Sequence, residues 1–199
     1  MVTLNISVLG HLQISAGQTI LDKFESNKVR ALFVYLVVEK ERPHSREALA
    51  ELVWPEATAQ SSLANLRYAL ADLRKVIGDE KANPPHLIIS RENLQFNAAS
   101  DCELDAATFS ELLNSGNIEK LKQGIALYQG DFLASFPSIE SDPFEEWILL
   151  KRSNTSGKPS SPWASSLTIT NNEANINRLC LSRTDKWNSN PGSKKPTSN

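Results

Sequence analysis

Amide, aromatic and basic side chains recur along residues 59–77 at spacings that place them on one side of a helix. The other side is apolar at spacings of three and four: Leu63, Leu66, Leu70, Leu73 and Ile77. At 100° per residue, the polar side presents the following residues: Ser61, Ala64, Asn65, Tyr68, Asp72 and Lys75. Arg67 and Arg74 share one flank. Because guanidinium groups bind phosphate and small or amide side chains fit against base edges, this surface is a candidate contact for nucleic acid.

The same periodicity also fits an ordinary amphipathic helix whose polar side is only solvated. The elements around the helix decide between the two interpretations. Residues 4–20 alternate between apolar and polar, which predicts a short antiparallel meander. Ser26 and Ser45 are placed to cap two further helices, of which the first ends before Pro43 and the second is stopped by Pro55.

A hairpin is predicted after the third helix. Residues 86–90 and 94–97 alternate on either side of a polar turn that contains Arg91. Strands, three helices and a terminal hairpin, in this order, are typical of a winged helix-turn-helix whose third helix enters the major groove of DNA. Arg91 at the tip of the hairpin is a candidate for contact with a minor groove or with phosphate, and simple solvation is the alternative.

The bulk composition fits a globular protein with one ordinary core or two small ones. The chain has 199 residues, of which 40% are hydrophobic. It lacks an apolar run of the roughly 18 residues that span a membrane and a start typical of a signal peptide, so we expect a cytoplasmic protein without membrane contact. Residues 1–100 hold 11 acidic and 11 basic residues, whereas residues 101–152 hold 10 and 4. The acidic second part argues against DNA contact there and favours protein contact or solvation.

No arrangement typical of a metal site, a disulfide framework or an enzyme is present. The two cysteines and three histidines have no ligand spacing: Cys102, Cys180, His11, His44 and His86. We therefore expect no cofactor and no metal. Glu145 and Glu146 do not form an acid–base pair, because adjacent residues diverge by about 100° on a helix. Without a nucleophile elbow, P-loop or Gly-rich dinucleotide turn, we expect a protein that is not an enzyme.

Several stretches resemble a known family in the order that the family shows. These are SNKVRALFVYLVVEKERPHSREALAELVWPE, SSLANLRYALADLRKVIG, ALYQGDFLASF and FEEWILLKR. Over residues 1–152 the chain resembles the Streptomyces antibiotic regulatory protein (SARP) family, which joins an OmpR-type winged helix to a bacterial transcriptional activator domain (BTAD). The resemblance implies an α+β winged helix-turn-helix over residues 1–100. It also implies an all-α, tetratricopeptide-like (TPR-like) fragment over residues 101–152.

The resemblance also implies a function, namely a DNA-binding transcription activator. It assigns DNA contact to Asn65, Arg67 and Arg74 on the third helix, with Arg91 on the wing. The turn at Arg91 lacks the glycine and aromatic residue that many members have there. Recruitment of RNA polymerase and binding to direct repeats, as a homodimer or in tandem, are further implications.

The pattern changes after residue 152. Of the last 47 residues, 18 are serine or asparagine, and no helical or strand period remains. A disordered tail is one explanation. A one-base frameshift near codon 152 is the other, because synonymous codons allow residues 153–199 to be translated in another frame as a helical string that looks like further repeats. A truncated array would leave four residues of the last predicted helix without part of their cover: Phe144, Trp147, Ile148 and Leu150.

A protein-interaction module is the competing function. In that interpretation the acidic helices of residues 103–152 bind a partner, and residues 1–100 only support them. Binding of duplex DNA with a steep salt dependence would distinguish the two interpretations.

Overall fold

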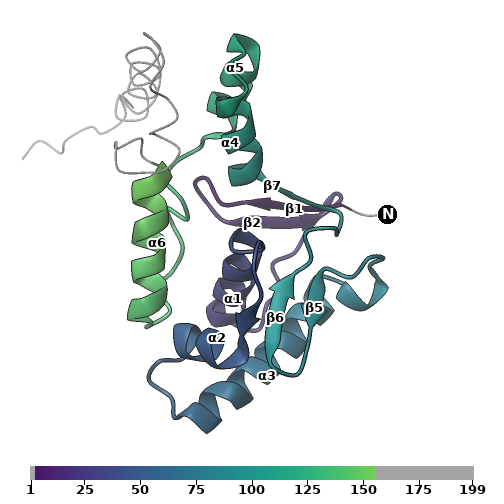
Figure 1. Ribbon diagram of the computed structural model, residues 1–199, viewed down its shortest axis with the longest axis vertical. Helices are drawn as coiled ribbons and strands as arrows, with labels where there is room; N and C mark the ends of the chain where they lie inside the picture. Colours follow the sequence, from purple (N-terminus) through teal and green to yellow (C-terminus); the bar gives the residue numbers. More distant parts are fainter. Residues whose placement is uncertain (1–2, 156–199) are drawn as a thin grey trace, which may run out of the picture. The chain divides into compact units, whose positions relative to one another are not determined.

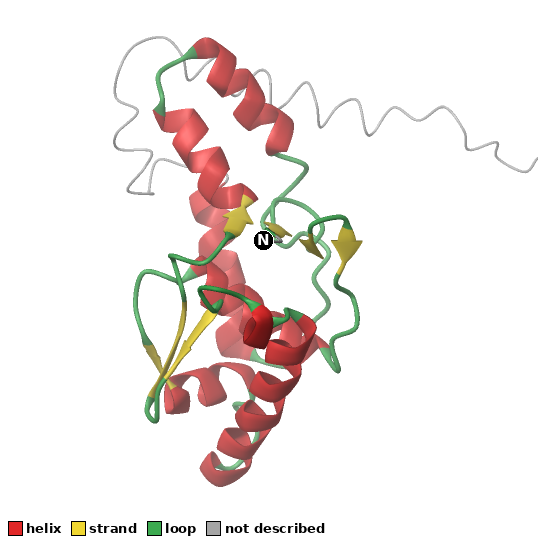
Figure 2. Ribbon diagram, turned by 90° about the vertical axis from the view of Figure 1, so that its right-hand side faces the viewer, coloured by secondary structure: helices red, strands yellow, loops and turns green. Residues whose placement is uncertain are grey.

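The structure is a computed structural model that describes residues 3–155. Strands form two separate small groups among the helices (Figure 2). The first group confirms the predicted meander, in which antiparallel strands β1, β2 and β3 follow one another. A later strand, β7, lies parallel to β1 on its other side. The bounds are Leu4–Ser7 for β1, Gln13–Ala16 for β2, Thr19–Ile20 for β3 and Cys102–Leu104 for β7.

Three helices follow the meander (Figure 1). They are α1 at Asn27–Val38, α2 at Arg46–Val53 and α3 at Ala59–Val76. Each begins at a hydroxyl side chain that accepts a hydrogen bond from a backbone N–H of the first turn, as N-cap residues do. The predicted caps Ser26 and Ser45 are confirmed, at 3.4 Å from the nitrogen of Val29 and 3.1 Å from that of Ala48. Thr58 caps α3 in the same way.

The predicted hairpin is also present, and it forms part of a second sheet. Its strands are β5 at Leu87–Ile89 and β6 at Asn93–Phe96. The two-residue strand β4, His44–Ser45, pairs with β6, so the strand order is β4-β6-β5. A short 3-10 helix, η1 at Asp79–Lys81, lies between α3 and the hairpin.

From α4 onward the acidic part of the chain is helical, as predicted, but the prediction is wrong for Cys102–Leu104, which pair with β1 as strand β7. The helices are α4 at Asp105–Asn114, α5 at Ile118–Leu127 and α6 at Asp142–Thr155. Helices α4 and α5 pack against each other, and Gly124 allows a close approach, because a Cβ there would lie 3.3 Å from Cβ of Leu112. Asp105 connects α4 to the first sheet by accepting hydrogen bonds from the backbone nitrogens of Val8 and Leu9, at 2.9 and 3.0 Å.

One hydrophobic cluster joins elements from both sides of residue 100. It includes apolar residues of the meander, of α1 to α3 and of the hairpin, together with six later residues: Leu104, Phe132, Leu133, Ile139, Phe144 and Ile148. The predicted loss of cover is therefore wrong for Phe144 and Ile148, which are 1% and 7% exposed. The physical reason is that α6 packs back against α1 and α2, so its apolar side needs no following repeat. Leu150, in contrast, is 65% exposed.

The C-terminal predictions fall almost entirely outside the described residues. Residues 153–155 continue α6, so the helix runs slightly past the predicted boundary. The disordered tail and the frameshift concern residues 156–199, which the structure does not describe. Within residues 3–155, no helix is long and apolar enough to cross a membrane.

Candidate nucleic-acid interface

Helix α3 has the two sides that its sequence predicts. Leu66, Leu70 and Leu73 are buried in the core, and Ile77 at the C-cap is 5% exposed. Leu63, one turn earlier, is half-buried. The helix is therefore anchored along one side, which presents the opposite side outward.

The predicted contact residues on α3 share the outward side. Ser61, Arg67, Tyr68 and Lys75 are exposed, and Ala64 and Asn65 are half-buried. Tyr68 is 72% exposed, an unusual position for an aromatic ring of this size. The hydroxyl of Ser61 also accepts a hydrogen bond from Oγ1 of Thr58 at 3.0 Å, so Ser61 belongs to the capping turn as well.

Two charged residues of α3 have partners within the chain. Asp72 accepts a hydrogen bond from the backbone nitrogen of Glu25 at 2.9 Å. Nε of Arg74 lies 3.1 Å from Oδ2 of Asp79, whose other carboxylate oxygen accepts the backbone N–H of Leu87 at 3.0 Å. Arg74 thus connects the end of α3 to the start of β5, and its predicted phosphate contact stays a prediction.

The wing has a tight turn with Arg91 at its tip. The backbone nitrogen of Ser90 donates to the carbonyl of Asn93 at 2.9 Å, and the nitrogen of Asn93 donates to Oγ of Ser90 at 2.8 Å. Arg91 lies between these two residues and is exposed. The turn therefore presents a cation to solvent on a closed backbone loop.

Sequence analysis did not identify Arg46 as part of this region. Its Nε and Nη2 donate to the carbonyl of Ser90 at 3.2 and 3.0 Å, and its backbone nitrogen donates to the carbonyl of Glu92 at 2.9 Å. The only local signal is its position directly after the cap Ser45. Nothing in the sequence indicates a contact with residues more than 40 positions later.

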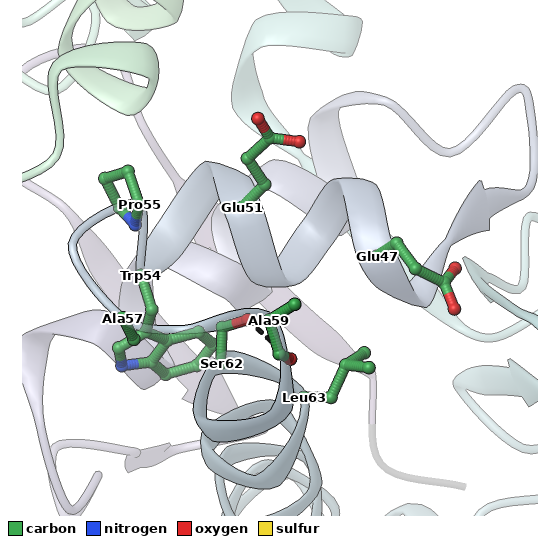
Figure 3. Close-up of a pocket in the computed structure, with 8 residues that line it drawn as sticks. All are labelled: Glu47, Glu51, Trp54, Pro55, Ala57, Ala59, Ser62 and Leu63. Carbon is green, nitrogen blue, oxygen red and sulfur yellow. Dashed lines mark hydrogen bonds between the residues drawn. The ribbon is translucent and has the colours of Figure 1, made fainter.

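A cavity of about 330 Å³ lies between α2 and the start of α3 (Figure 3). Its lining includes Trp54 and two exposed carboxylates, Glu47 and Glu51. These carboxylates repel phosphate, so the cavity is not an extension of a phosphate-binding surface. Among the described residues there is also no group of three His, Cys, Asp or Glu arranged to hold a metal ion.

Glu39, the C-cap of α1, is one point at which polar side chains of α6 contact the helices of the winged-helix part. Its Oε1 accepts hydrogen bonds from Nε1 of Trp147 at 2.8 Å and from Nζ of Lys151 at 2.7 Å. Burial opposes ionisation of Glu39, but the hydrogen bonds from Lys151 and Trp147 and the charges of Lys151 and Arg42 outweigh it and hold its pKa below the ordinary value. The contact thus favours the charged carboxylate.

Taken together, the meander, the three helices and the wing define a winged-helix fold. One solved structure with this fold is EmbR of Mycobacterium tuberculosis in complex with a low-affinity phosphopeptide. The TM-score is 0.60 at 18% sequence identity, over 92% of this chain and 52% of EmbR. The chain thus spans about half the length of EmbR, and the likeness shows the fold. No family model and no curated protein matches the chain.

Proposed function

We propose that the chain is a sequence-specific DNA-binding transcription regulator, and an activator, that reads the major groove with α3. The observation that carries this proposal is the outward side of α3, where Tyr68 is exposed with Asn65 and Arg67 on its two flanks, while Leu66, Leu70 and Leu73 are buried on the other side. The fold shared with EmbR supports a regulator. The proposal includes an OmpR-type winged helix and a TPR-like activator domain that begins at α4.

The dimensions and side chains of α3 suit this role. Its 18 residues span about 27 Å, and the major groove of B-DNA admits a helix. In this arrangement Ser61, Ala64, Asn65 and Tyr68 face base edges, with the amide of Asn65 suited to adenine. The basic residues bind phosphate: Arg67 and Lys75 on the open surface, with Arg74 only through the part of its guanidinium that Asp79 and Glu80 do not occupy.

The wing adds a second contact, since Arg91 at its tip fits a minor groove or the adjacent phosphates. The proposed partners are double-stranded DNA and RNA polymerase, with homodimers or tandem copies on direct repeats. The proposed cellular location is the cytoplasm. The chemistry requires no cofactor, no metal and no catalytic residue.

Fluorescence anisotropy of the full chain with duplex DNA across a salt series tests this proposal. We expect binding that weakens steeply with salt, and Arg67→Ala should lower the log–log slope by about 1. Lys122→Ala is the matched control, because it removes the same charge from the exposed surface of α5. Absence of binding by the wild type at low salt would contradict the proposal.

Sequence specificity needs a separate experiment. Selection from a random duplex library should enrich a common motif, and Asn65→Ala should relax the preference at one position of that motif by about 1–3 kcal/mol. An unenriched library would indicate nonspecific binding only.

A protein-interaction module built on α4 and α5 is the second candidate function. Gly124 is the one buried residue of these two helices, and Ile118 is 59% exposed. Apart from the surface that the two helices bury against each other, apolar area at Ile118 is thus open to a further partner. This candidate predicts that Ile118→Asp abolishes partner capture and leaves DNA binding unchanged, whereas the regulator proposal is tested by Arg67.

A further inference from the structure

Arg46 holds the turn at the tip of the wing from the neighbouring helix α2. Two nitrogens of its guanidinium bond to one carbonyl, that of Ser90, and its own backbone nitrogen bonds to the carbonyl of Glu92. These two carbonyls flank Arg91. A single residue therefore contacts the backbone on both sides of the exposed cation.

The chain segment before Arg46 attaches to the same hairpin. Ser45 is the register partner of Asn93 in the sheet, and Nε2 of Gln95 donates to the carbonyl of Lys40 at 2.9 Å. Ser45 also caps α2, so the strand contact and the helix start share one residue. The wing is thus joined to the helices by successive contacts, and the contact from Arg46 is the outermost, at the turn itself.

We propose that Arg46 is a positioning residue that acts through Arg91, by holding the wing turn in the conformation that contacts DNA. The inference rests on the proposed function. Nε and Nη2 of Arg46 both donate to a carbonyl of the protein, whereas Arg91 is exposed at the tip of a closed turn. Ordering the turn before binding reduces the conformational entropy that DNA contact would otherwise cost.

A double-mutant cycle tests the dependence of one arginine on the other. We expect Arg91→Ala to weaken DNA binding and to lower the salt slope by about 0.9, the value for one phosphate. Arg46→Ala should weaken binding by no more than Arg91→Ala. In the Arg91→Ala background, adding Arg46→Ala should change the affinity by less than about twofold, because the two residues act as one unit.

The opposite results overturn the inference. If the two single effects multiply and the slope falls by a further 0.9 or so, Arg46 binds phosphate itself. If Arg91→Ala leaves DNA binding by the full chain unchanged, Arg91 does not contact DNA, and Arg46 cannot act through it. Lys122→Ala again controls for the loss of one positive charge.

Hydrogen–deuterium exchange separates this inference from the proposed function, since it needs no DNA. Arg46→Ala should raise deuterium uptake in the peptide that covers residues 87–96, relative to wild type and Lys122→Ala. Unchanged uptake shows that Arg46 does not hold the turn and overturns the inference. If uptake rises but the wild type binds no DNA, the proposed function and the DNA-contact role of the turn are both overturned. Arg46 then only stabilises the conformation of the turn.

Discussion

Trp147 donates its indole N–H to Oε1 of Glu39 across 2.8 Å, although the two residues are 108 positions apart. Around this bond, the ring of Trp147 contacts Tyr35 of α1 and Phe132, with centroids 5.0 and 5.5 Å apart. Helix α6 therefore packs onto the winged-helix part as a component of its core. Four predictions follow from this and other contacts in the described part of the chain.

The first prediction concerns Phe144 of α6, whose side chain lies in the core and is 1% exposed. Phe144→Ala should lower the free energy of unfolding by about 3–5 kcal/mol, because it leaves a cavity in a packed core. Leu150→Ala, on the 65% exposed side of the same helix, is the matched control and should stay within about 0.5 kcal/mol of wild type. Urea unfolding of the full chain measures both. Equal effects of the two variants would show that α6 does not share the core.

The second prediction separates the two arginines of α3. Arg74→Ala leaves the buried carboxylate of Asp79 with one remaining hydrogen bond and should cost about 1–3 kcal/mol, toward the lower end because the arginine side chain is 38% exposed. Arg67→Ala removes an exposed side chain and should leave stability within about 0.5 kcal/mol. Thermal unfolding and the DNA salt series should therefore rank the two variants in opposite orders. If Arg74→Ala is as stable as wild type and lowers the salt slope of DNA binding, Arg74 is a phosphate contact and not a structural residue.

The third prediction is a loss of stability in acid that depends on Glu39. The folded-state pKa of this carboxyl lies below its ordinary value of 4.5, so its contribution is fully present above about pH 4.5 and is lost as the pH falls through the folded-state pKa. Glu39→Gln should flatten the stability profile in this range. Lys151→Met removes the cation that holds the pKa down and should shift the loss to higher pH. Unfolding curves between pH 3 and 6 test this, and identical profiles for wild type and Glu39→Gln would refute it.

The fourth prediction concerns His86, which is 5% exposed and has no hydrogen-bond partner at Nδ1 among residues 3–155. Burial lowers its pKa below 6.5, and the charges of Asp79 and Asp101 only partly oppose this. Because the unfolded chain takes up the proton first, stability should be full above about pH 6.5 and should fall as the pH drops toward the folded-state pKa. His86→Leu should remove this pH dependence. A slope between pH 5 and 7 that persists in His86→Leu would assign it to another group.

Much of α3 could be predicted from interactions between residues that are close in the sequence. The leucine side of the helix follows from a spacing of 3.6 residues per turn, and a serine before an apolar repeat is a local capping signal. The same local signals identified the outward residues Asn65, Arg67 and Tyr68. Thr58 lies just before the same helix and caps it, a role that the sequence analysis does not assign.

Other features were not predictable, because they depend on which distant segments meet. The apolar residues Phe144 and Ile148 indicated a buried side, but not that α1 and α2 would cover it. The strand β7 was missed, since three residues next to a helix carry little pattern and their pairing with β1 joins segments about a hundred residues apart.

The sequence by itself determined the order of the meander, the three helices and the hairpin, the buried side of α3 and the type of side chain on its outer side. These features depend on periodicity and on neighbours within one or two turns. Only the tertiary structure decided which of the arginines bond to acceptors within the described part of the chain. Arg67 and Arg91 are exposed, whereas Arg74 is bonded to Asp79 and Arg46 to the wing turn. The physical reason is that a guanidinium bonds to whichever acceptor the fold brings within about 3 Å, and no local pattern encodes that distance.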